Sequence, residues 1–331
     1  MSDAARLNYA LGQGLLLPEG PMLAIRPTAS PEWREHVERL ECLQSFKPDH
    51  DALASLGLRM VQEVGATASA LVCLTRSREE SLANIAAAWS ALPERGLLLI
   101  SGEKKQGADA IFKSVRKVAE VDGSTSKAHG RLFWITVGAT RPDVLADWHA
   151  AGQMRRNGAG YLTAPGMFSP DKVDAGSQLL ADAFAGELKG DVADLGAGWG
   201  WLSAAALTSS DKIDSIKLIE AEKLSLNAAQ QNIDDARASF EWGDATALPA
   251  RRVFDTVISN PPFHKTRAAD PELGRAFIAS AARVLKSSGT FWMVANRQLP
   301  YESALETHFQ RWEELPGNGA FKLFRARRPR S

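Results

Sequence analysis

The second half of the chain alternates short apolar runs with segments of helical periodicity. Such runs cover residues 191–195, 216–220, 240–244, 253–259 and 290–295, and helix-forming segments separate them. This alternation predicts parallel strands joined by helices, because a parallel neighbour is reached only through a crossover connection. Residues 312–325 break the pattern with two runs around the turn sequence Pro-Gly-Asn-Gly, which indicates an antiparallel hairpin. We therefore expect a doubly wound α/β sheet of seven strands that ends in this hairpin.

The first half of the chain carries a weaker form of the same alternation. Strands are predicted at the apolar runs 71–74, 96–100 and 132–137. Helix formers with apolar residues at helical spacing fill residues 79–92, between the first two of these runs. The short runs at 15–17 and 22–25 are parted by the turn sequence Pro-Glu-Gly, and we expect both to be early strands.

Glycines and prolines accumulate between residues 152 and 166, where the apolar periodicity weakens. Domain boundaries fall in such segments, so we place the junction near residue 160. The two expected domains are residues 1–155 and residues 165–331.

Composition narrows the class of protein. The chain has 331 residues and is 45% apolar, which is ample for packed cores. Lys plus Arg and Asp plus Glu both number 39, so net charge gives no overall attraction for nucleic acid and any polyanion must be held by local patches. Cys42 and Cys73 have no metal-ligand spacing, and we expect neither a disulfide nor a metal site. No apolar run approaches the roughly 20 residues that cross a bilayer, and the polar start does not resemble a signal peptide, so we expect a cytoplasmic protein.

Glycines and acids follow the first three apolar runs of the second half. In an open parallel sheet, ligands bind beyond the carboxyl ends of the strands, so these residues meet at one edge. Gly196 and Gly198 allow a tight turn and a close approach to a ligand, and Asp194 can accept hydrogen bonds there. Glu220, at the end of the next run, can accept from both hydroxyls of a ribose. Asp244, at the end of the third, suits the amino group of an adenine ring.

A dinucleotide site is the rival interpretation of this glycine loop. Its pattern is G-x-G-x-x-G, whereas here the third glycine comes one residue early, at Gly200, and Trp201 stands in its place. A bulky ring would obstruct the close approach of helix and strand that the pattern requires. The spacing favours a cofactor made of adenosine and an amino acid over NAD, and a tight turn without a ligand is the structural alternative.

The fourth run ends in Asn-Pro-Pro-Phe at residues 260–263. Consecutive prolines fix the backbone and remove donors, so this loop presents carbonyl oxygens, to which Asn260 adds its amide oxygen. Such acceptors can bind both hydrogens of a planar amino group and draw its lone pair toward an electrophile. Phe263 can stack on a flipped base, an interaction of ~1–3 kcal/mol. Alternatively the loop is rigid only and its phenylalanine belongs to the core. The candidate catalytic residues are Asn260, Pro261, Pro262 and Phe263, and the candidate cofactor-binding residues are Asp194, Gly196, Ala197, Gly198, Glu220, Asp244 and Asn260.

These motifs resemble those of class I S-adenosylmethionine-dependent methyltransferases of the Asn-Pro-Pro-Phe type. More narrowly, the second half is similar to the bacterial small-subunit ribosomal RNA guanine-N2 methyltransferase C family. The matching segments are residues 165–169, 174–180, 194–198, 259–264, 294–296 with 299–301, and 319–322. The resemblance implies S-adenosyl-L-methionine at Gly196, Gly198, Glu220 and Asp244, with the guanine amino group at Asn260, Pro261 and Phe263. It also implies that residues 1–155 are a degenerate methyltransferase copy that binds no cofactor and helps to hold RNA.

The leading hypothesis is therefore transfer of a methyl group to the N2 of a guanine in ribosomal RNA, most simply 16S rRNA. Its partner would be ribosomal RNA or the small ribosomal subunit, with no membrane, and the protein is expected to be a monomer. Adenine N6 and a protein glutamine are also planar amines suited to an Asn-Pro-Pro loop. A catalytically silent RNA-binding module is the alternative outside enzymes.

Overall fold

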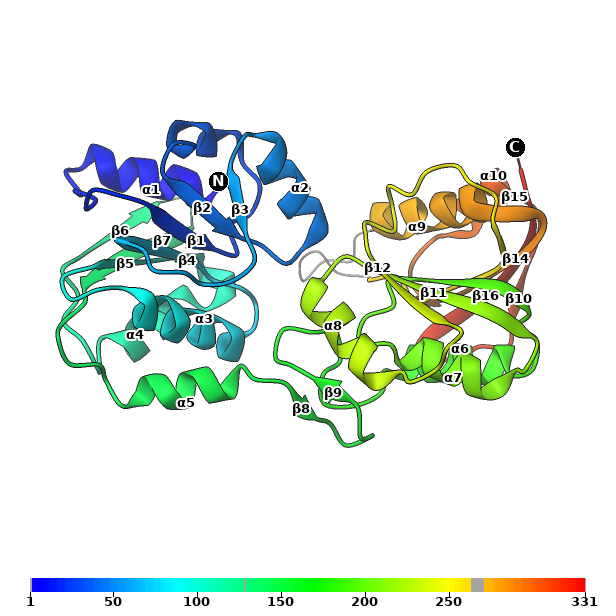
Figure 1. Cartoon of the computed structure of the whole chain (residues 1–331). Coiled ribbons are helices and arrows are strands. Elements are labelled where there is room, and N and C mark those ends of the chain that lie inside the picture. Colours follow the sequence, from blue (N-terminus) through cyan, green and yellow to red (C-terminus); the bar gives the residue numbers. More distant parts are fainter. Residues whose placement is uncertain (1, 128, 263–270, 331) are drawn as a thin grey trace. The chain divides into compact units, whose positions relative to one another are not determined.

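The computed structural model describes residues 2–127, 129–262 and 271–330. The chain forms two compact units (Figure 1). One comprises Met1–Met154 with Ala164–Gly166, and the other comprises Arg155–Thr163 with Met167–Ser331. The segment between the units therefore alternates: residues 155–163 belong to the second unit, residues 164–166 to the first, and the chain from residue 167 onward to the second.

The amino-terminal unit is built on a sheet of seven strands in the order β3-β2-β1-β4-β5-β7-β6. Helices α3, α4 and α5 cover one face, and α1 and α2 cover the other (Figure 1). Its elements are α1 (Asp3–Gly12), β1 (Met22–Ile25), η1 (Pro31–His36), β2 (Leu40–Leu43), α2 (Lys47–Ser55), β3 (Arg59–Val61), β4 (Ser69–Cys73), α3 (Arg78–Ala91), β5 (Leu97–Glu103), η2 (Lys104–Gln106), α4 (Ala108–Val115), β6 (Gly123–Lys127), β7 (Gly130–Thr136) and α5 (Val144–Ala151).

The carboxyl-terminal unit has a second sheet of seven strands, in the order β12-β11-β10-β13-β14-β16-β15. A small pair, β8 with β9, precedes it. Its elements are β8 (Arg155–Arg156), β9 (Leu162–Thr163), α6 (Ala175–Phe184), β10 (Gly190–Leu195), α7 (Trp201–Ser209), β11 (Ile213–Glu220), α8 (Lys223–Asn232), β12 (Ala238–Trp242), β13 (Phe254–Ser259), α9 (Pro271–Val284), β14 (Leu285–Asn296), α10 (Glu302–His308), β15 (Phe309–Leu315) and β16 (Phe321–Pro329).

The two sheets have the same order of strands. Counted within each unit, that order is third, second, first, fourth, fifth, seventh, sixth. In both sheets the first five strands pair in parallel, and the seventh pairs antiparallel with the fifth and the sixth. This confirms the expected architecture of two tandem methyltransferase-type α/β units, with the second sheet ending in the predicted hairpin, β15–β16.

Burial on both faces explains why the central strands of the second sheet, β10, β13 and β14, are rich in apolar residues. Along β10, Val192 joins the core under α6, α7 and α8, whereas Ala193 and Leu195 join the core under α9 and α10. Figure 1 shows α6 and α7 on one side of this sheet and α9 and α10 on the other. The central strands are therefore rigid, and polar residues placed at their ends are held at fixed positions.

The expectation of a strand at residues 15–17 is wrong. Gly14, at φ +95°, follows the end of α1, and the Leu15 N–H donates to the Ala10 carbonyl at 3.0 Å. A glycine in the left-handed region followed by an apolar residue is a common way to close a helix. The apolar run therefore belongs to the turn that closes α1, and Leu16 is 84% exposed. The neighbouring expectation at residues 22–25 is confirmed as β1.

No helix within residues 2–127, 129–262 and 271–330 has the length and apolar character needed to cross a membrane.

Candidate active site at the carboxyl edge of the second sheet

The candidate residues lie where the strand order of the second sheet reverses. Strand β10 pairs with β11 on one side and with β13 on the other, and the chain reaches these neighbours by connections that run in opposite directions. Ligands of open parallel sheets bind outside the carboxyl ends of the strands at this kind of position. Asp194 is paired in register with Leu218 of β11 and Ile258 of β13, so the three strand ends are level.

The glycine loop leaves β10 and turns sharply into α7. Its first amides are tied to the neighbouring strand, since the Gly196 N–H donates to the Ile219 carbonyl at 2.9 Å. Gly198 has φ +57°, a conformation that residues with a side chain rarely adopt, and a Cβ at this position would meet no atom within 4 Å. The backbone at Gly198 therefore faces open space, and a ligand can approach it. Ala197, between the two glycines, is buried.

Glu220 ends β11 and contacts the glycine loop directly. Its Oε2 accepts from the Gly198 N–H at 2.8 Å, and its Oε1 accepts from the Glu222 N–H at 2.7 Å. Burial raises the pKa of this carboxyl, whereas the two backbone N–H donors oppose the rise. Because an ionised carboxylate has about four acceptor positions, each oxygen can still accept a hydroxyl.

Asp194 is the most deeply buried acid of the site, with 1% of its surface exposed. Its Oδ2 accepts from the Ser203 hydroxyl at 2.7 Å, whereas Oδ1 has no hydrogen-bond partner among the described residues. Burial raises the pKa of Asp194 to about 7; the Ser203 hydrogen bond lowers it, and the nearby Glu220 raises it. A buried acceptor without a donor costs stability, and such groups occur preferentially where a ligand supplies the missing partner.

Asp244 follows β12, the next strand outward. Its Oδ1 accepts from both the N–H of Thr246, at 2.8 Å, and the Thr246 hydroxyl, at 2.7 Å, which fixes the carboxylate in a tight local turn. Glu220 pairs in register with Trp242, and the Gly243 N–H donates to the Glu220 carbonyl at 3.0 Å, so Asp244 lies two residues beyond this pair at the same edge. Its Oδ2 has no hydrogen-bond partner in the described part of the chain.

Asn260 follows β13, and its amide is held from the side of α6. The Nδ2 group donates to Asp174 Oδ2 at 2.9 Å and to Ser177 Oγ at 2.8 Å. The amide oxygen Oδ1 is buried and has no partner among residues 2–127, 129–262 and 271–330. Pro261 is buried and Pro262 is exposed, and Phe263, the fourth expected catalytic residue, lies outside the described residues.

The structure therefore brings Asp194, the glycine loop, Glu220, Asp244 and Asn260 to one edge of one sheet. Three supporting residues were missed from the sequence. Ser203 lies nine positions after Asp194, and its only signal was a hydroxyl in the helix after the glycine loop. Asp174 caps α6, since its Oδ2 accepts from the Ser177 N–H at 2.9 Å. Nothing local indicated that Asp174 and Ser177 also hold the amide of Asn260.

Strand order, glycine loop and strand-end acids together define a class I methyltransferase. A family model described as "Methyltransferase small domain" matches residues 159–325. The curated relative "Ribosomal RNA small subunit methyltransferase C" of Yersinia pestis (strain Pestoides F) is 30% identical over 307 residues, which cover 88% of this chain and 84% of the relative. The protein of the same name from Enterobacter sp. (strain 638) is 33% identical over 239 residues, covering 69% of this chain and 66% of the relative. The chain belongs to the ribosomal RNA small subunit methyltransferase C family.

This membership confirms the family expected from the motifs, and with it the class of enzyme and its S-adenosylmethionine cofactor. A solved structure has the same two-unit fold with a TM-score of 0.78 at 23% identity, covering 99% of this chain and 93% of that chain. It is described as the T. thermophilus 16S rRNA N2 methyltransferase in complex with AdoMet and guanosine.

In the first sheet, the residue that directly follows β1 differs from the residue that directly follows β10 in the second sheet. The Arg26 N–H donates to the Leu43 carbonyl at 2.8 Å, as the Gly196 N–H donates to the Ile219 carbonyl at 2.9 Å. Both residues have positive φ, +60° for Arg26 and +74° for Gly196. Arg26 therefore stands where the second unit has the first glycine of its loop.

The side chain of Arg26 occupies this edge of the first sheet. It donates to Gln44 Oε1 at 3.2 Å and to Ser45 Oγ, and it forms an ion pair with Glu80 at 3.2 Å. Gln44 directly follows β2, in the place that Glu220 has in the second unit. An arginine, its ion pair and a neutral amide thus replace a glycine loop and a carboxylate.

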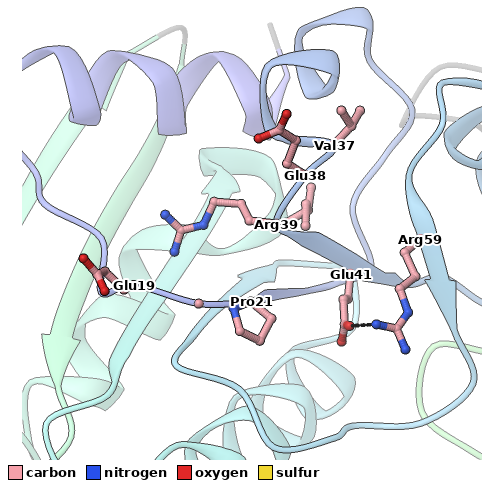
Figure 2. Close-up of a pocket in the computed structure, with 9 residues that line it drawn as sticks. Glu19, Pro21, Val37, Glu38, Arg39, Glu41 and Arg59 are labelled. Carbon is pink, nitrogen blue, oxygen red and sulfur yellow. Dashed lines mark ion pairs between the residues drawn. The ribbon is translucent and has the colours of Figure 1, made fainter.

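A pocket of about 600 Å³ lies elsewhere in the amino-terminal unit (Figure 2). It is lined by Pro21, before β1, by Arg39 and Glu41 at the start of β2, and by Arg59 at the start of β3. Figure 2 shows the ion pair between Glu41 and Arg59, which measures 2.6 Å. The pocket is at the amino ends of these strands, opposite the edge that binds ligands in such sheets, and no candidate residue lines it.

Proposed function

We propose that this protein transfers a methyl group from S-adenosyl-L-methionine to the exocyclic N2 of a guanine in ribosomal RNA, and that this RNA is the 16S rRNA of the small ribosomal subunit. The observation that carries the proposal is the orientation of Asn260. Its amide presents a buried oxygen without a partner among the described residues, next to a proline carbonyl. A planar amino group supplies the donors that such a pair of acceptors lacks.

The residues around the glycine loop fit the cofactor. Glu220 has an acceptor position left on each oxygen for a ribose diol, and Asp244 Oδ2 can accept from an adenine amino group. Asp194 adds a buried carboxylate, one oxygen of which has no hydrogen-bond partner within the described residues. Its negative charge suits the positively charged part of the cofactor. The open backbone of Gly196, Ala197 and Gly198, together with Asn260, completes the set proposed to bind it. When bound, the cofactor supplies an electrophilic methyl group on a sulfonium sulfur.

The chemistry proposed for Asn260 and Pro261 is activation of a weak nucleophile. Their oxygens accept from the two N–H groups of the guanine amine and pull its lone pair out of conjugation with the ring. The nitrogen–methyl bond forms as the sulfur–methyl bond breaks, and the proton that becomes acidic passes to solvent. No strong base is required, so alignment is the main contribution, and a well-oriented pair gains ~7–11 kcal/mol from proximity. Pro262 would stiffen the loop and Phe263 would stack on the base.

The family name supports ribosomal RNA as the substrate, and the guanosine in the T. thermophilus structure supports guanine over adenine. Adenine N6, a protein glutamine and a silent RNA-binding role are the other candidates that the loop allows. The test is transfer of labelled methyl to 16S rRNA and small subunits from a deletion strain, followed by mass spectrometry of the nucleosides. N2-methylguanosine is expected with the wild-type protein and is expected to vanish with Asn260→Ala. Methylated adenosine or methylated protein would identify a different substrate, and no transfer at all would indicate a catalytically silent binding module.

For the amino-terminal unit we propose a scaffold and RNA-holding role without a cofactor. Arg26, with its ion pair to Glu80, fills the place of the glycine loop, and Gln44 cannot replace the charge of Glu220. Residues 1–155 would then be the degenerate copy and residues 165–331 the catalytic domain. The cytoplasmic location and the monomeric state stay predictions.

A further inference from the structure

Asn260 is held by two acceptors from the first turn of α6. Its Nδ2 group donates to Asp174 Oδ2 at 2.9 Å and to Ser177 Oγ at 2.8 Å. The same Asp174 oxygen accepts from the Ser177 N–H at 2.9 Å and so caps α6. One carboxylate oxygen therefore fixes the start of the helix and the amide of a loop 86 residues away.

The two acceptors decide which way the amide of Asn260 points. An amide has a donor end and an acceptor end of nearly equal size, and a flip exchanges them. A flipped amide would set its oxygen against the Asp174 carboxylate, where two acceptors repel each other and the NH₂ group loses both partners. The observed orientation is thus strongly preferred, and it leaves Oδ1 as the end that is buried without a partner among the described residues.

Gly176 keeps room for this arrangement. A Cβ at Gly176 would lie 3.0 Å from Asp174 Oδ2 and 3.0 Å from the Phe321 ring, which is tighter than ordinary contact. The sequence Asp-Ala-Gly-Ser at residues 174–177 therefore places two acceptors, Asp174 and Ser177, in one helical turn, with a residue that has no side chain, Gly176, between them.

We infer that Asp174 and Ser177 are positioning residues, which hold Asn260 so that its Oδ1, rather than its Nδ2, faces the amino group to be methylated. The inference rests on the proposed function, because it needs a planar amine at Asn260. Neither residue is assigned a contact with the substrate; both act through the amide.

Exchanging the two partners tests the inference. In Asn260→Asp, two carboxylates would lie about as close as the 2.9 Å of the present hydrogen bond, and in an assay at alkaline pH, where both ionise, they would repel each other and turn the loop oxygen away from the amino group. We expect kcat to fall on the order of a hundredfold, as when a group aimed at the reacting atom is lost. The double variant Asp174→Asn/Asn260→Asp places a donor opposite an acceptor again, but it gives up the cap of α6, because the Asp174 oxygen that faces Asn260 is also the one that accepts the Ser177 N–H. We expect it to regain at least about tenfold in kcat over Asn260→Asp, since a hydrogen bond to a charged group is restored.

Asp182→Asn is the matched control. Asp182 is a carboxylate on the same helix that accepts from Gln178 at 2.9 Å. Combined with Asn260→Asp, it should give no recovery. Thermal unfolding should show that every variant is folded, and adding Asp174→Asn or Asp182→Asn to Asn260→Asp should leave the S-adenosylmethionine Kd close to that of Asn260→Asp, because a positioning role changes kcat and not cofactor binding. A folded double exchange no more active than Asn260→Asp would overturn the inference, as would equal recovery with Asp182→Asn.

Ser177→Ala provides a second test that leaves the charges and the cap untouched. Loss of one of two acceptors should lower kcat several-fold at unchanged cofactor Kd, and an unchanged kcat would count against the inference. The failure of the proposed function is distinguishable, since the wild-type protein itself would then methylate no guanine in rRNA.

Discussion

Replacing Asp194 by Asn is expected to stabilise the cofactor-free protein, and to do so in a pH-dependent way. Burial raises the pKa of Asp194 from 3.8 to about 7. Between these two values the folded protein holds one proton more than the unfolded chain, so its stability falls as the pH rises. Above pH 7 the buried carboxylate costs roughly 4 kcal/mol, from about three pKa units at about 1.4 kcal/mol each. Asparagine has the same shape and carries no charge to bury.

Urea unfolding of the wild-type protein and of Asp194→Asn at pH 5 and at pH 8 measures this cost. The free energy of unfolding of the variant, relative to the wild type, should increase by roughly 3 kcal/mol from pH 5 to pH 8. About two of the three pKa units by which the pKa of Asp194 is raised lie above pH 5. Equal differences at both pH values would refute the reasoning, since Asp194 would then titrate at its ordinary pKa. Ser203→Ala is an internal check: its hydroxyl lowers the pKa of Asp194, so its loss should enlarge the pH dependence.

The same carboxylate should link cofactor binding to pH. A positively charged ligand favours ionised Asp194, so binding below pH 7 should release a proton and strengthen as the pH rises toward 7, by up to about tenfold per pH unit. Calorimetry in two buffers of different ionisation enthalpy measures this proton. Asp194→Asn should release none and should bind more weakly, and a proton released by the variant would assign the linkage to another group.

Three further predictions concern the cofactor and the amino-terminal unit. Calorimetry should find one S-adenosylmethionine per chain, because Arg26 fills the equivalent edge of the first sheet; a stoichiometry of two would contradict this. Glu220→Gln should raise the cofactor Kd roughly tenfold to a hundredfold, the value of a hydrogen bond to a charged group, and an unchanged Kd would argue against ribose binding there. Gly166→Ala should destabilise the amino-terminal unit by about 1–3 kcal/mol in thermal unfolding, because φ is +95° and the new Cβ would lie 2.3 Å from Glu80 Oε2; a wild-type melting temperature would show that the segment shifts freely.

The strand ends of the second unit could be predicted because the information is local. The runs that form β10, β13 and β14 are largely buried parallel strands, and the last residue of each strand from β10 to β13, or the loop after it, reaches one shared edge of the sheet. Asp194, Glu220, Asp244 and Asn260 could therefore be grouped without knowing the packing of any helix. In the first unit, the short apolar runs predicted β1 correctly. The prediction failed at residues 15–17, where an apolar run closes a helix and does not form a strand.

Contacts between distant segments could not be predicted in this way. The hydrogen bonds from Asn260 to Asp174 and Ser177 join residues more than 80 positions apart, and only the docking of α6 against the sheet creates them. The same holds for Arg26, whose ion pair with Glu80 becomes visible only when two strand ends and a helix start meet. A capping aspartate and a surface arginine look alike in sequence whether or not they carry such a second role.

The most direct test of the central claim is the identity of the methylated nucleoside. Small ribosomal subunits and free 16S rRNA from a deletion strain would be incubated with the purified protein and labelled S-adenosylmethionine, then digested and analysed by mass spectrometry. Label in N2-methylguanosine, absent with Asn260→Ala, is the result expected here. Label in N6-methyladenosine or in protein, or no label in any fraction, would contradict the proposal that Asn260 and Pro261 present a guanine amino group to the methyl donor.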